Sequence, residues 1–251
     1  MDKKVTIVTG GTYGIGRGIA MRLAKDGYKV IALGNNDKYH QQSKLLFNSN
    51  GLDIDVHLCD VSIVSDVQKT VKETLDRYSR IDVLCNVAAI RPVGNILETD
   101  QNTWEQTFDV NVKGVYLFCK EVLPHMISMQ KGIIINFGST SGNGGTSHIA
   151  YCTTKGAITA LTKCLALDHV KDHIRVNAVI PGSTLSGMNE NRPESITKKI
   201  AENNVAGRIN EPDDIANAVA FLVSDQAATI SGAFLDIGTV QGKMAIIERW
   251  N

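Results

Sequence analysis

The chain has 251 residues, which is enough for one large domain with a well-buried core, although length alone would also allow two small domains. Its 26 basic residues balance 26 acidic ones and no run of like charge occurs. This argues against a surface for nucleic acids or other polyanions, so small molecules and further copies of the chain are the expected partners.

The cysteines are scattered and form no CxxC pair, a pattern that fits neither a disulfide framework nor a zinc site. Buried free thiols are therefore expected at Cys59, Cys85, Cys119, Cys152 and Cys164. The N-terminus has no apolar run long enough for a signal peptide, and no later segment approaches the ~20 apolar residues that a membrane helix needs. A cytoplasmic protein that contacts no membrane is the expectation.

Short β-branched runs recur along the chain, and each is followed by a longer segment with helical spacing. The runs are nearly continuous in apolar character, as in strands that helices cover on both faces. The predicted strands are 5–10, 29–33, 53–60, 81–86, 132–139, 174–182 and a short one at 231–236, and the predicted helices are 14–26, 38–49, 65–79, 101–128, 150–169 and 212–224. The alternation predicts an α/β fold, a Rossmann-like doubly wound parallel sheet of about seven strands, in a single domain over residues 1–251.

The segment at about 183–207 is rich in Ser, Asn and Glu and has weak periodicity. Two interpretations stay open, a mobile lid over a ligand and an ordinary surface loop. In a doubly wound sheet ligands bind at the carboxyl ends of the strands, which favours the lid.

A glycine-rich turn, TGGTYGIG over residues 9–16, joins the first predicted strand to the first helix. Glycine permits a positive φ and a close approach to a pyrophosphate, whose charge the free N–H groups of the helix start can bind. The spacing of Gly10, Gly14 and Gly16 differs from the common GxGxxG and resembles the TGxxxGIG motif of the short-chain dehydrogenase/reductase family.

That resemblance implies an oxidoreductase with an NAD(P) site, and it can be followed along the chain. The residues that it assigns to the cofactor around the turn are Gly10, Thr12, Tyr13, Gly14, Ile15 and Gly16. Asp60-Val61 resembles the family's adenine-contacting pair, although Asp60 could instead cap the helix that begins near Ile63. Asn86-Val87-Ala88-Ala89 stands where the family has N-N-A-G, and Asn86 and Ala88 keep its pattern. Pro181, Gly182, Thr184 and Ser186 resemble the segment that holds the nicotinamide carboxamide.

The sequence leaves the choice between NAD and NADP open. An acidic residue at the end of the second strand favours the 2′-hydroxyl of NAD, and a nearby arginine or lysine favours the 2′-phosphate of NADP. This chain has Gly34, Asn35 and Asn36 there. Asn35 is expected to bind the cofactor; the missing carboxylate tolerates NADP, whereas Asp37 reaching back would favour NAD.

Tyr151 and Lys155 lie four residues apart in a predicted helix, so their side chains share one face. A free tyrosine has a pKa near ~10, and a nearby ammonium stabilises the phenolate. After the glycine turn, this pair resembles the family's YxxxK motif. The resemblance implies that Tyr151 transfers a proton and that Lys155 lowers its pKa and binds the cofactor ribose.

The family also supplies a serine and an asparagine. Ser139, at the end of the fifth strand, resembles the serine that orients the substrate oxygen, although its interval to Tyr151 is one residue shorter than the family's frequent one. A shortened glycine run at 142–145 accounts for this, and Ser141 is the alternative. Asn111 resembles the asparagine that holds a water in the proton relay. Hydride then passes between substrate and nicotinamide, and no metal is implied.

The substrate pocket is expected after the serine, after Ala89 and from Met188 onward. Its candidate residues are Arg91, Ser141, Asn143, His148 and Met188. The expected reaction interconverts a secondary alcohol and a ketone on a small polar sugar, polyol or secondary metabolite, or else reduces a 3-oxoacyl thioester. A regulatory nucleotide-binding protein without turnover is the alternative of another class. Residues 207–238 resemble family elements that pack together in a homotetramer.

Overall fold

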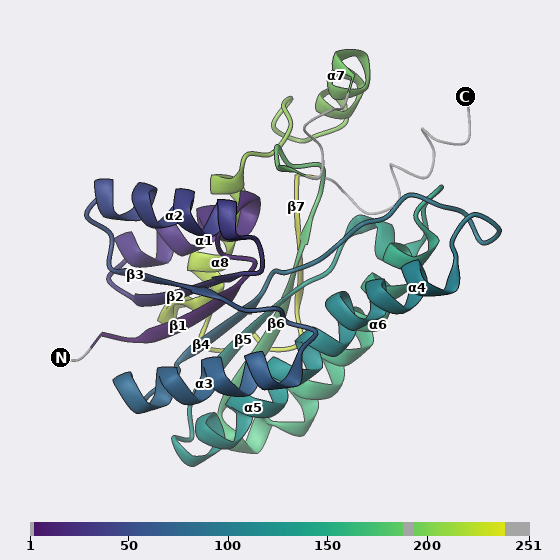
Figure 1. Cartoon of the computed structure of the whole chain (residues 1–251). Coiled ribbons are helices and arrows are strands. Elements are labelled where there is room, and N and C mark those ends of the chain that lie inside the picture. The colour runs from purple at the N-terminus through teal and green to yellow at the C-terminus, as the bar shows by residue number, and fades with distance from the viewer. Residues whose placement is uncertain (1–2, 188–192, 239–251) are drawn as a thin grey trace.

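The computed structural model describes residues 3–187 and 193–238. Its centre is one parallel sheet of seven strands in the order β3-β2-β1-β4-β5-β6-β7 (Figure 1). The strands are β1 (Val5–Thr9), β2 (Lys29–Gly34), β3 (Ile54–Leu58), β4 (Val83–Asn86), β5 (Gly132–Phe137), β6 (Ile174–Pro181) and β7 (Phe234–Ile237). The predicted doubly wound fold is confirmed.

Helices cover both faces of the sheet (Figure 1). One layer contains α1 (Gly14–Lys25), α2 (Asp37–Ser49) and α8 (Pro212–Val223), and the other contains α3 (Val64–Tyr78), α5 (Gly114–Ser128) and α6 (Ile149–Asp168). Successive residues of a strand pack against opposite helix layers. On β5, Ile134 packs toward α3, α5 and α6, whereas Ile135 packs toward α1, α2 and α8. This explains why the strands are apolar throughout, since both of their faces are buried.

The chain is helical over 101–128 as predicted, but the helix is not α-helical throughout. It consists of α4 (Gln101–Phe108), a π-helical turn (Asp109–Lys113) and α5, which adjoin without a gap. The π-turn inserts one extra residue into a helical turn and was not predicted from the sequence. The turn places Asn111 inward, where it is buried.

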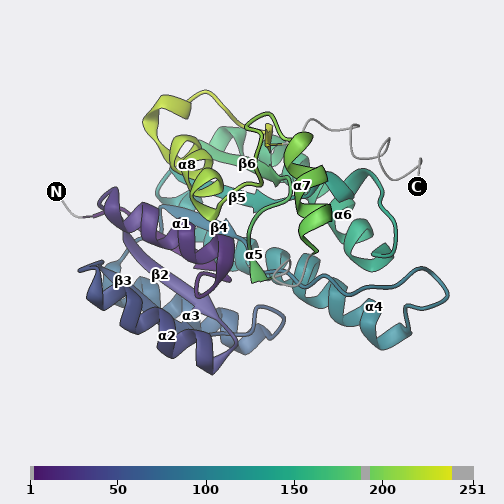
Figure 2. The ribbon, with the colours of Figure 1, turned by 90° about the horizontal axis from the view of Figure 1, so that it is seen from above.

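The second difference lies in the segment at 183–207, which contains a helix, α7 (Glu194–Glu202). Figure 2 shows α7 between the α1 and α8 pair and the α4 and α6 region. None of its residues is fully buried, so its apolar stripe is short and the sequence pattern is weak. The other predicted elements agree with the structure to within about three residues at each end.

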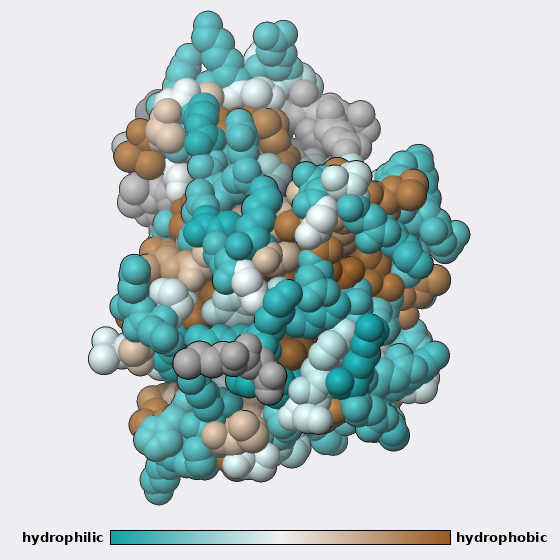
Figure 3. All heavy atoms as spheres, turned by 90° about the vertical axis from the view of Figure 1, so that its left-hand side faces the viewer, coloured by the Kyte–Doolittle hydropathy of each residue, from teal (hydrophilic) through white to brown (hydrophobic). Residues whose placement is uncertain are grey.

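Strand β3 forms one edge of the sheet, and charged side chains cover it. Lys29 contacts Asp53 at 2.6 Å and Asp55 at 2.7 Å, and Arg77 reaches Asp55 at 2.9 Å. Figure 3 views this side of the molecule and shows a mostly hydrophilic surface. Such charges oppose edge-to-edge pairing with another sheet. Across the described residues, no helix combines the length and the apolar character needed to cross a membrane.

Candidate active site

A cleft of about 1280 Å³ lies at the carboxyl ends of the strands. It extends from the glycine turn to Tyr151, and α4 and α7 contribute to its walls. The cleft meets β1 and β4, between which the strand order reverses direction. This is the place where a doubly wound sheet leaves a crevice for a ligand.

The glycine turn is shaped for the close approach of a ligand. Gly10 has a φ of +65°, and a Cβ atom on it would lie 3.0 Å from the Ala88 Cα. A Cβ atom on Gly16 would overlap the Gly10 carbonyl oxygen. Tyr13 precedes α1 and provides no side-chain cap, so the first N–H groups of the helix face the cleft without that partner. The residues present therefore fit a pyrophosphate.

Aromatic side chains border the next part of the cleft. The rings of Tyr13 and Tyr39 stack with centroids 4.1 Å apart, and the Arg17 guanidinium lies 5.5 Å from the Tyr13 centroid. The Tyr13 ring also packs on the backbone of Gly187, where a Cβ atom would overlap it. Tyr39 was missed in the sequence because nothing in its spacing within α2 distinguishes it from a surface residue.

Asp60 lies at this end of the cleft and does not cap α3. Its carboxylate accepts hydrogen bonds from the Ser62 hydroxyl at 2.6 Å and the Ser62 N–H at 2.9 Å, and from Asn35 at 3.3 Å. The residue preceding α3 is Ile63, which provides no side-chain cap. Burial opposes ionisation of Asp60, but the bonds from Ser62 and Asn35 outweigh it and hold the pKa of Asp60 below its usual value.

Asn86 is not where the sequence placed it. Its side chain is buried below the cleft, where the amide donates to the Asn136 side-chain oxygen at 2.9 Å. The neighbouring residues Val87, Ala88 and Ala89 line the cleft instead. The Thr9 hydroxyl accepts the N–H groups of Val87 and Ala88 at 3.0 and 3.1 Å, which fixes this stretch against β1.

The segment after β6 closes the opposite wall. The Gly182 N–H bonds to the Ile237 carbonyl at 2.9 Å and the Thr184 hydroxyl to the Gly182 carbonyl at 3.0 Å. Ser186 follows and faces Gly14 across the cleft. Pro181, Gly182, Thr184 and Ser186 all line the cleft as predicted, whereas Met188 lies outside the described residues.

Ser139, Tyr151 and Lys155 meet at the inner end of the cleft. Tyr151 and Lys155 project from the first turns of α6, and the Lys155 Nζ lies 5.5 Å from the centre of the Tyr151 ring. Ser139 follows β5 and bonds to the Tyr151 side chain. Its hydroxyl also accepts the Ser141 N–H at 3.1 Å, in a short turn over Thr140–Asn143.

Burial dominates the electrostatics of this group. It raises the pKa of Tyr151, while the hydrogen bond with Ser139 and the charge of Arg91 act in the opposite direction. Burial also lowers the pKa of Lys155 to about 8, although its ammonium donates to the Phe137 carbonyl at 2.7 Å. In the protein alone burial outweighs these two effects and the pKa of Tyr151 is raised, so the lowering of that pKa by Lys155 stays a prediction for the enzyme with its cofactor bound.

Asn111 lies behind the cleft and does not line it. Its side chain accepts the Ile90 N–H at 2.8 Å, donates to the Ile90 carbonyl at 2.9 Å and donates to the Thr154 hydroxyl at 3.1 Å. The amide thereby joins the π-turn, the segment after β4 and α6. Since Thr154 precedes Lys155, Asn111 fixes the position of the helix turn that carries the lysine.

Of the predicted substrate residues, Arg91, Ser141 and His148 line the cleft and Asn143 does not. Asn143 is exposed because the short turn after Ser139 directs it outward. Two further walls of the cleft were not predicted, although the sequence carries a signal for each. One is a polar row on α4 at helical spacing, and the other is the pair Ile196 and Ile200 on α7. The row consists of Asn102, Glu105, Gln106 and Asp109.

Comparison with known proteins agrees with this geometry. A family model described as enoyl-(acyl carrier protein) reductase matches residues 10–238. The chain is 36% identical to meso-2,3-butanediol dehydrogenase of Serratia marcescens, over 94% of this chain and 93% of that one. It is 34% identical to 2-(S)-hydroxypropyl-CoM dehydrogenase 3 of Xanthobacter autotrophicus, with 93% and 94% covered.

Among solved structures, a variant of actinorhodin polyketide ketoreductase with NADPH superposes with a TM-score of 0.89. It is 29% identical, and the match covers 95% of this chain and 98% of that one. The family model and the superposed structure both cover nearly all of the described residues, and both are consistent with the fold and the cleft. The chain therefore belongs to the short-chain dehydrogenase/reductase family and is an NAD(P)-dependent oxidoreductase.

Proposed function

We propose that the enzyme interconverts a secondary alcohol and a ketone of a small polar metabolite. The observation that carries this proposal is the group of Ser139, Tyr151 and Lys155 at the inner end of the cleft, with the Tyr151 ring 9% exposed. The two relatives named above are, by their names, dehydrogenases of hydroxylated compounds.

In this proposal Tyr151 donates a proton to the ketone oxygen, or accepts one from the alcohol, at its hydroxyl. Ser139 donates a hydrogen bond to the same substrate oxygen and holds it beside Tyr151. Lys155 binds the ribose hydroxyls of the cofactor and keeps a positive charge below the tyrosine ring. Asn111 positions the helix turn that carries Lys155. NAD(P), when bound, supplies or accepts the hydride.

The cofactor would occupy the cleft from Asp60 to Lys155. The backbone N–H groups at the start of α1 would bind the pyrophosphate, Asp60 and Val61 the adenine, and the stretch from Pro181 to Ser186 the nicotinamide carboxamide. The fit rests on the glycine turn, where a Cβ atom at Gly10 would press on the Ala88 backbone and one at Gly16 would overlap the Gly10 carbonyl oxygen. Such a substitution would distort the turn and weaken cofactor binding.

We further propose that NAD and NADP are both accepted. The Asn36 oxygen is used to cap α2 through the Tyr39 N–H at 3.2 Å, and the Asn35 amide bonds to Asp60. Thr12 fills the space beside Gly34. The strand end itself, Gly34 to Asn36, has no acidic residue to bind a 2′-hydroxyl or repel a 2′-phosphate, since the nearby carboxylates belong to Asp37 on α2 and to Asp60, and Arg17 lies over the Tyr13 ring.

A 3-oxoacyl thioester is the second candidate substrate, favoured by a relative named 3-oxoacyl-[acyl-carrier-protein] reductase in Staphylococcus epidermidis, which is 32% identical over 93% of this chain. The polar row on α4 favours the small polar metabolite, because an acyl chain would bury those side chains against hydrocarbon. Reduction of a panel of hydroxy-ketones, oxo-sugars and acyl thioesters, followed by absorbance of the reduced cofactor, separates the two. Preference for the thioesters would reject the polar metabolite.

The proposed chemistry is tested with Tyr151→Phe, which keeps the ring and removes the proton. Turnover should fall by about 10²–10⁴-fold, the usual contribution of a general acid or base, while cofactor binding followed by fluorescence stays intact. Full turnover in this variant would refute the role of Tyr151. Tight cofactor binding without turnover of any compound by the unchanged enzyme would instead support a regulatory protein.

The serine assignment has its own test. Ser139→Ala should lose most turnover because the Ser139 side chain bonds to Tyr151, whereas Ser141→Ala, which removes the neighbouring hydroxyl of the same turn, should keep it. The reverse result would transfer the role to Ser141. Steady-state rates at saturating cofactor measure both variants.

We propose a homotetramer as the assembly. Strand β7 is an edge of the sheet, and Phe221 on α8 is 41% exposed, so both elements offer surface to a second copy. Sedimentation over a range of concentrations should give four times the chain mass of 27.2 kDa. A single-chain mass at all concentrations would reject the assembly.

A further inference from the structure

Arg91 places a positive charge on the cleft wall near the reacting group. It lines the same cleft as Ser139 and Tyr151. Its charge reaches Tyr151, whose pKa it lowers against the effect of burial.

The backbone on both sides of Arg91 is fixed. Asn111 binds the N–H and the carbonyl of Ile90, as described above, and the His148 Nδ1 lies 2.9 Å from the Pro92 carbonyl oxygen. Two residues later, the Gly94 N–H bonds to the Ser147 carbonyl at 2.8 Å. The arginine therefore projects from a segment that is bound to the π-turn on one side and to the start of α6 on the other.

The other charges of the cleft lie on other elements. Among the described residues, Asp60 is at the adenine end, Lys155 belongs to α6, and Glu105 and Asp109 belong to the row on α4 and its π-turn. Each of these α4-side carboxylates has a partner one turn away, since Glu105 accepts from Gln101 at 2.6 Å and Asp109 contacts Lys113 at 3.1 Å. An anion entering the inner cleft meets two positive charges, Arg91 on the wall and Lys155 beside Tyr151, together with the uncharged donors of Ser141 and Ser147.

We propose that Arg91 binds an anionic group of the substrate, and that the preferred substrates are short oxo acids and the corresponding hydroxy acids. The inference rests on the proposed function, because it places the anion a few bonds from the carbon that Tyr151 and Ser139 serve. A planar guanidinium can bind a carboxylate through two parallel hydrogen bonds, which also orients the substrate. A thioester carbonyl at the same distance carries no charge and gains nothing from this residue.

The experiment compares pyruvate, acetoacetate and levulinate with their methyl esters, which differ from the acids mainly in charge. At least one acid should exceed its ester by about 10- to 100-fold in kcat/KM, the range expected for a hydrogen bond to a charged group. Arg91→Met should remove this preference, because the acid loses the binding of its charge in addition to any effect on Tyr151 that acid and ester share. Arg91→Lys should restore part of it, because the charge returns without the planar geometry.

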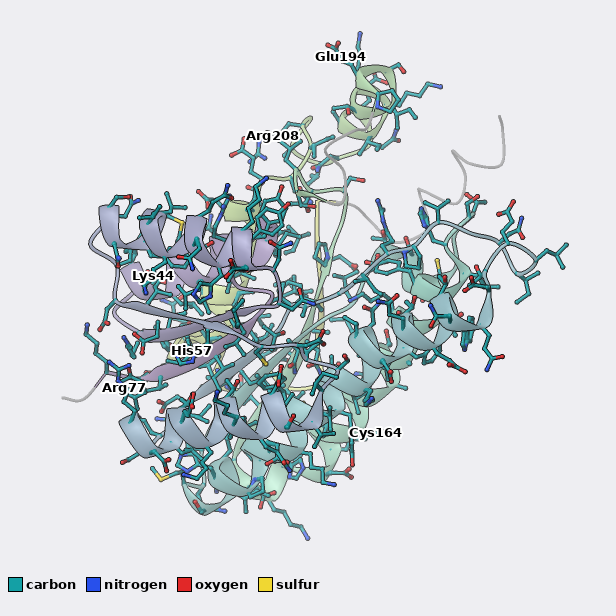
Figure 4. The ribbon with its side chains drawn as sticks, in the orientation of Figure 1. Lys44, His57, Arg77, Cys164, Glu194 and Arg208 are labelled. Atoms are coloured by element: carbon teal, nitrogen blue, oxygen red, sulfur yellow. The ribbon has the colours of Figure 1, made fainter. Side chains whose placement is uncertain are left out.

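Arg77→Met is the matched control, since it removes the same charge at the β3 side of the molecule, far from α7 (Figure 4). Its preference for acids should equal that of the unchanged enzyme. Esters that equal or exceed their acids throughout would overturn the proposal. So would an Arg91→Met variant that loses acid and ester activity equally, which would indicate a structural role.

The proposed function can fail separately. If the enzyme turns over neutral ketones but none of the oxo acids, the proposed oxidoreduction of ketones stands and the proposed anion site at Arg91 is rejected. If no ketone of either charge is turned over, the proposed function fails, and binding of the acids and esters to the complex with reduced cofactor decides about Arg91. Tighter, Arg91-dependent binding of the acids, measured by cofactor fluorescence, retains the site, and equal binding rejects it.

Discussion

The Lys155 ammonium is completely buried, and burial lowers its pKa to about 8 from an ordinary value of 10.5. A lysine whose pKa is depressed by folding destabilises the protein while it must stay protonated, below about pH 8. As the pH rises from 8 toward 10.5, the folded protein releases the proton before the unfolded chain does, and stability increases. The residue proposed to hold the cofactor is thus retained at a cost to the fold.

Lys155→Met should therefore stabilise the cofactor-free protein at pH 7 by up to about 3 kcal/mol, the value of the pKa difference, while it abolishes turnover. The gain should shrink as the pH approaches 10, because the unchanged enzyme then carries a neutral amine. Urea unfolding at pH 7, 8.5 and 10 measures both effects. Lys120→Met, on exposed α5 surface, should change nothing, and a less stable Lys155→Met protein at pH 7 would contradict the argument.

At the end of β2, Asn35→Asp should convert an unselective enzyme into one that prefers NAD. The new carboxylate would accept the 2′-hydroxyl and repel a 2′-phosphate, so the ratio of kcat/KM for NAD over NADP should rise about 10-fold or more. The neighbouring change Asn36→Asp, which keeps the cap of α2, is the control with the same charge. A ratio that stays constant in Asn35→Asp would show that the ribose does not lie at this residue.

Single residues were predictable from the sequence where spacing alone fixes a shared helix face. Tyr151 and Lys155 are the clearest case, because four residues of helix leave no freedom in their relative direction. Asn86 was misplaced because at a strand end one residue of register decides between cleft and core, and the residue whose amide is buried there is not marked in the sequence. The prediction that Asn143 lines the substrate pocket was wrong because the direction of this side chain depends on the short turn after Ser139.

At the level of elements, the sequence predicted those whose apolar pattern is long and missed those defined by a local irregularity. The π-turn occupies only Asp109–Lys113 inside a long helical segment, and the sequence pattern did not reveal it or the inward position of Asn111, which binds Ile90. Helix α7 is short and contains no buried residue, so its periodicity comes from Ile196 and Ile200 alone. The π-turn and α7 both contribute residues to the cleft, and departures from regular secondary-structure patterns are expected at functional sites.

We expect helix α7 to contribute to substrate binding in the cleft and little to the stability of the fold. The double variant Ile196→Ala with Ile200→Ala removes its cleft-lining side chains and should raise the KM for substrate about 10-fold, since each side chain loses apolar contact worth roughly 1 kcal/mol or less at partial exposure. The unfolding free energy should change by less than about 1 kcal/mol. Steady-state kinetics and urea unfolding measure the two quantities.

The control for α7 is Lys198→Ala with Lys199→Ala, which alters the same helix at residues that do not line the cleft. Unchanged KM values are expected there. A loss of stability in the isoleucine variant, without a change in KM, would assign α7 to the core instead.

At the scale of the whole molecule, alternating strands and helices predicted the doubly wound sheet because each crossover between parallel strands must be right-handed. The strand order then follows: the chain builds outward from β1 to β3, returns to β4 beside β1, and continues to β7. The cleft lies where this direction reverses. The fold therefore locates the site, while the side chains that occupy it depend on loops that the topology does not determine.

The two hydrophobic clusters share the sheet as a common wall, so they should unfold together as the single domain predicted from the sequence. Ile134 and Ile135 are adjacent on β5, both fully buried, and face opposite clusters. Each Ile→Ala change should lower the unfolding free energy by about 2–5 kcal/mol. Because the strand belongs to both layers, each variant should shift one common transition when circular dichroism and tryptophan fluorescence are followed in urea at fixed protein concentration. Two separated transitions, one moved by each variant, would show instead that the layers on the two faces of the sheet are independent units.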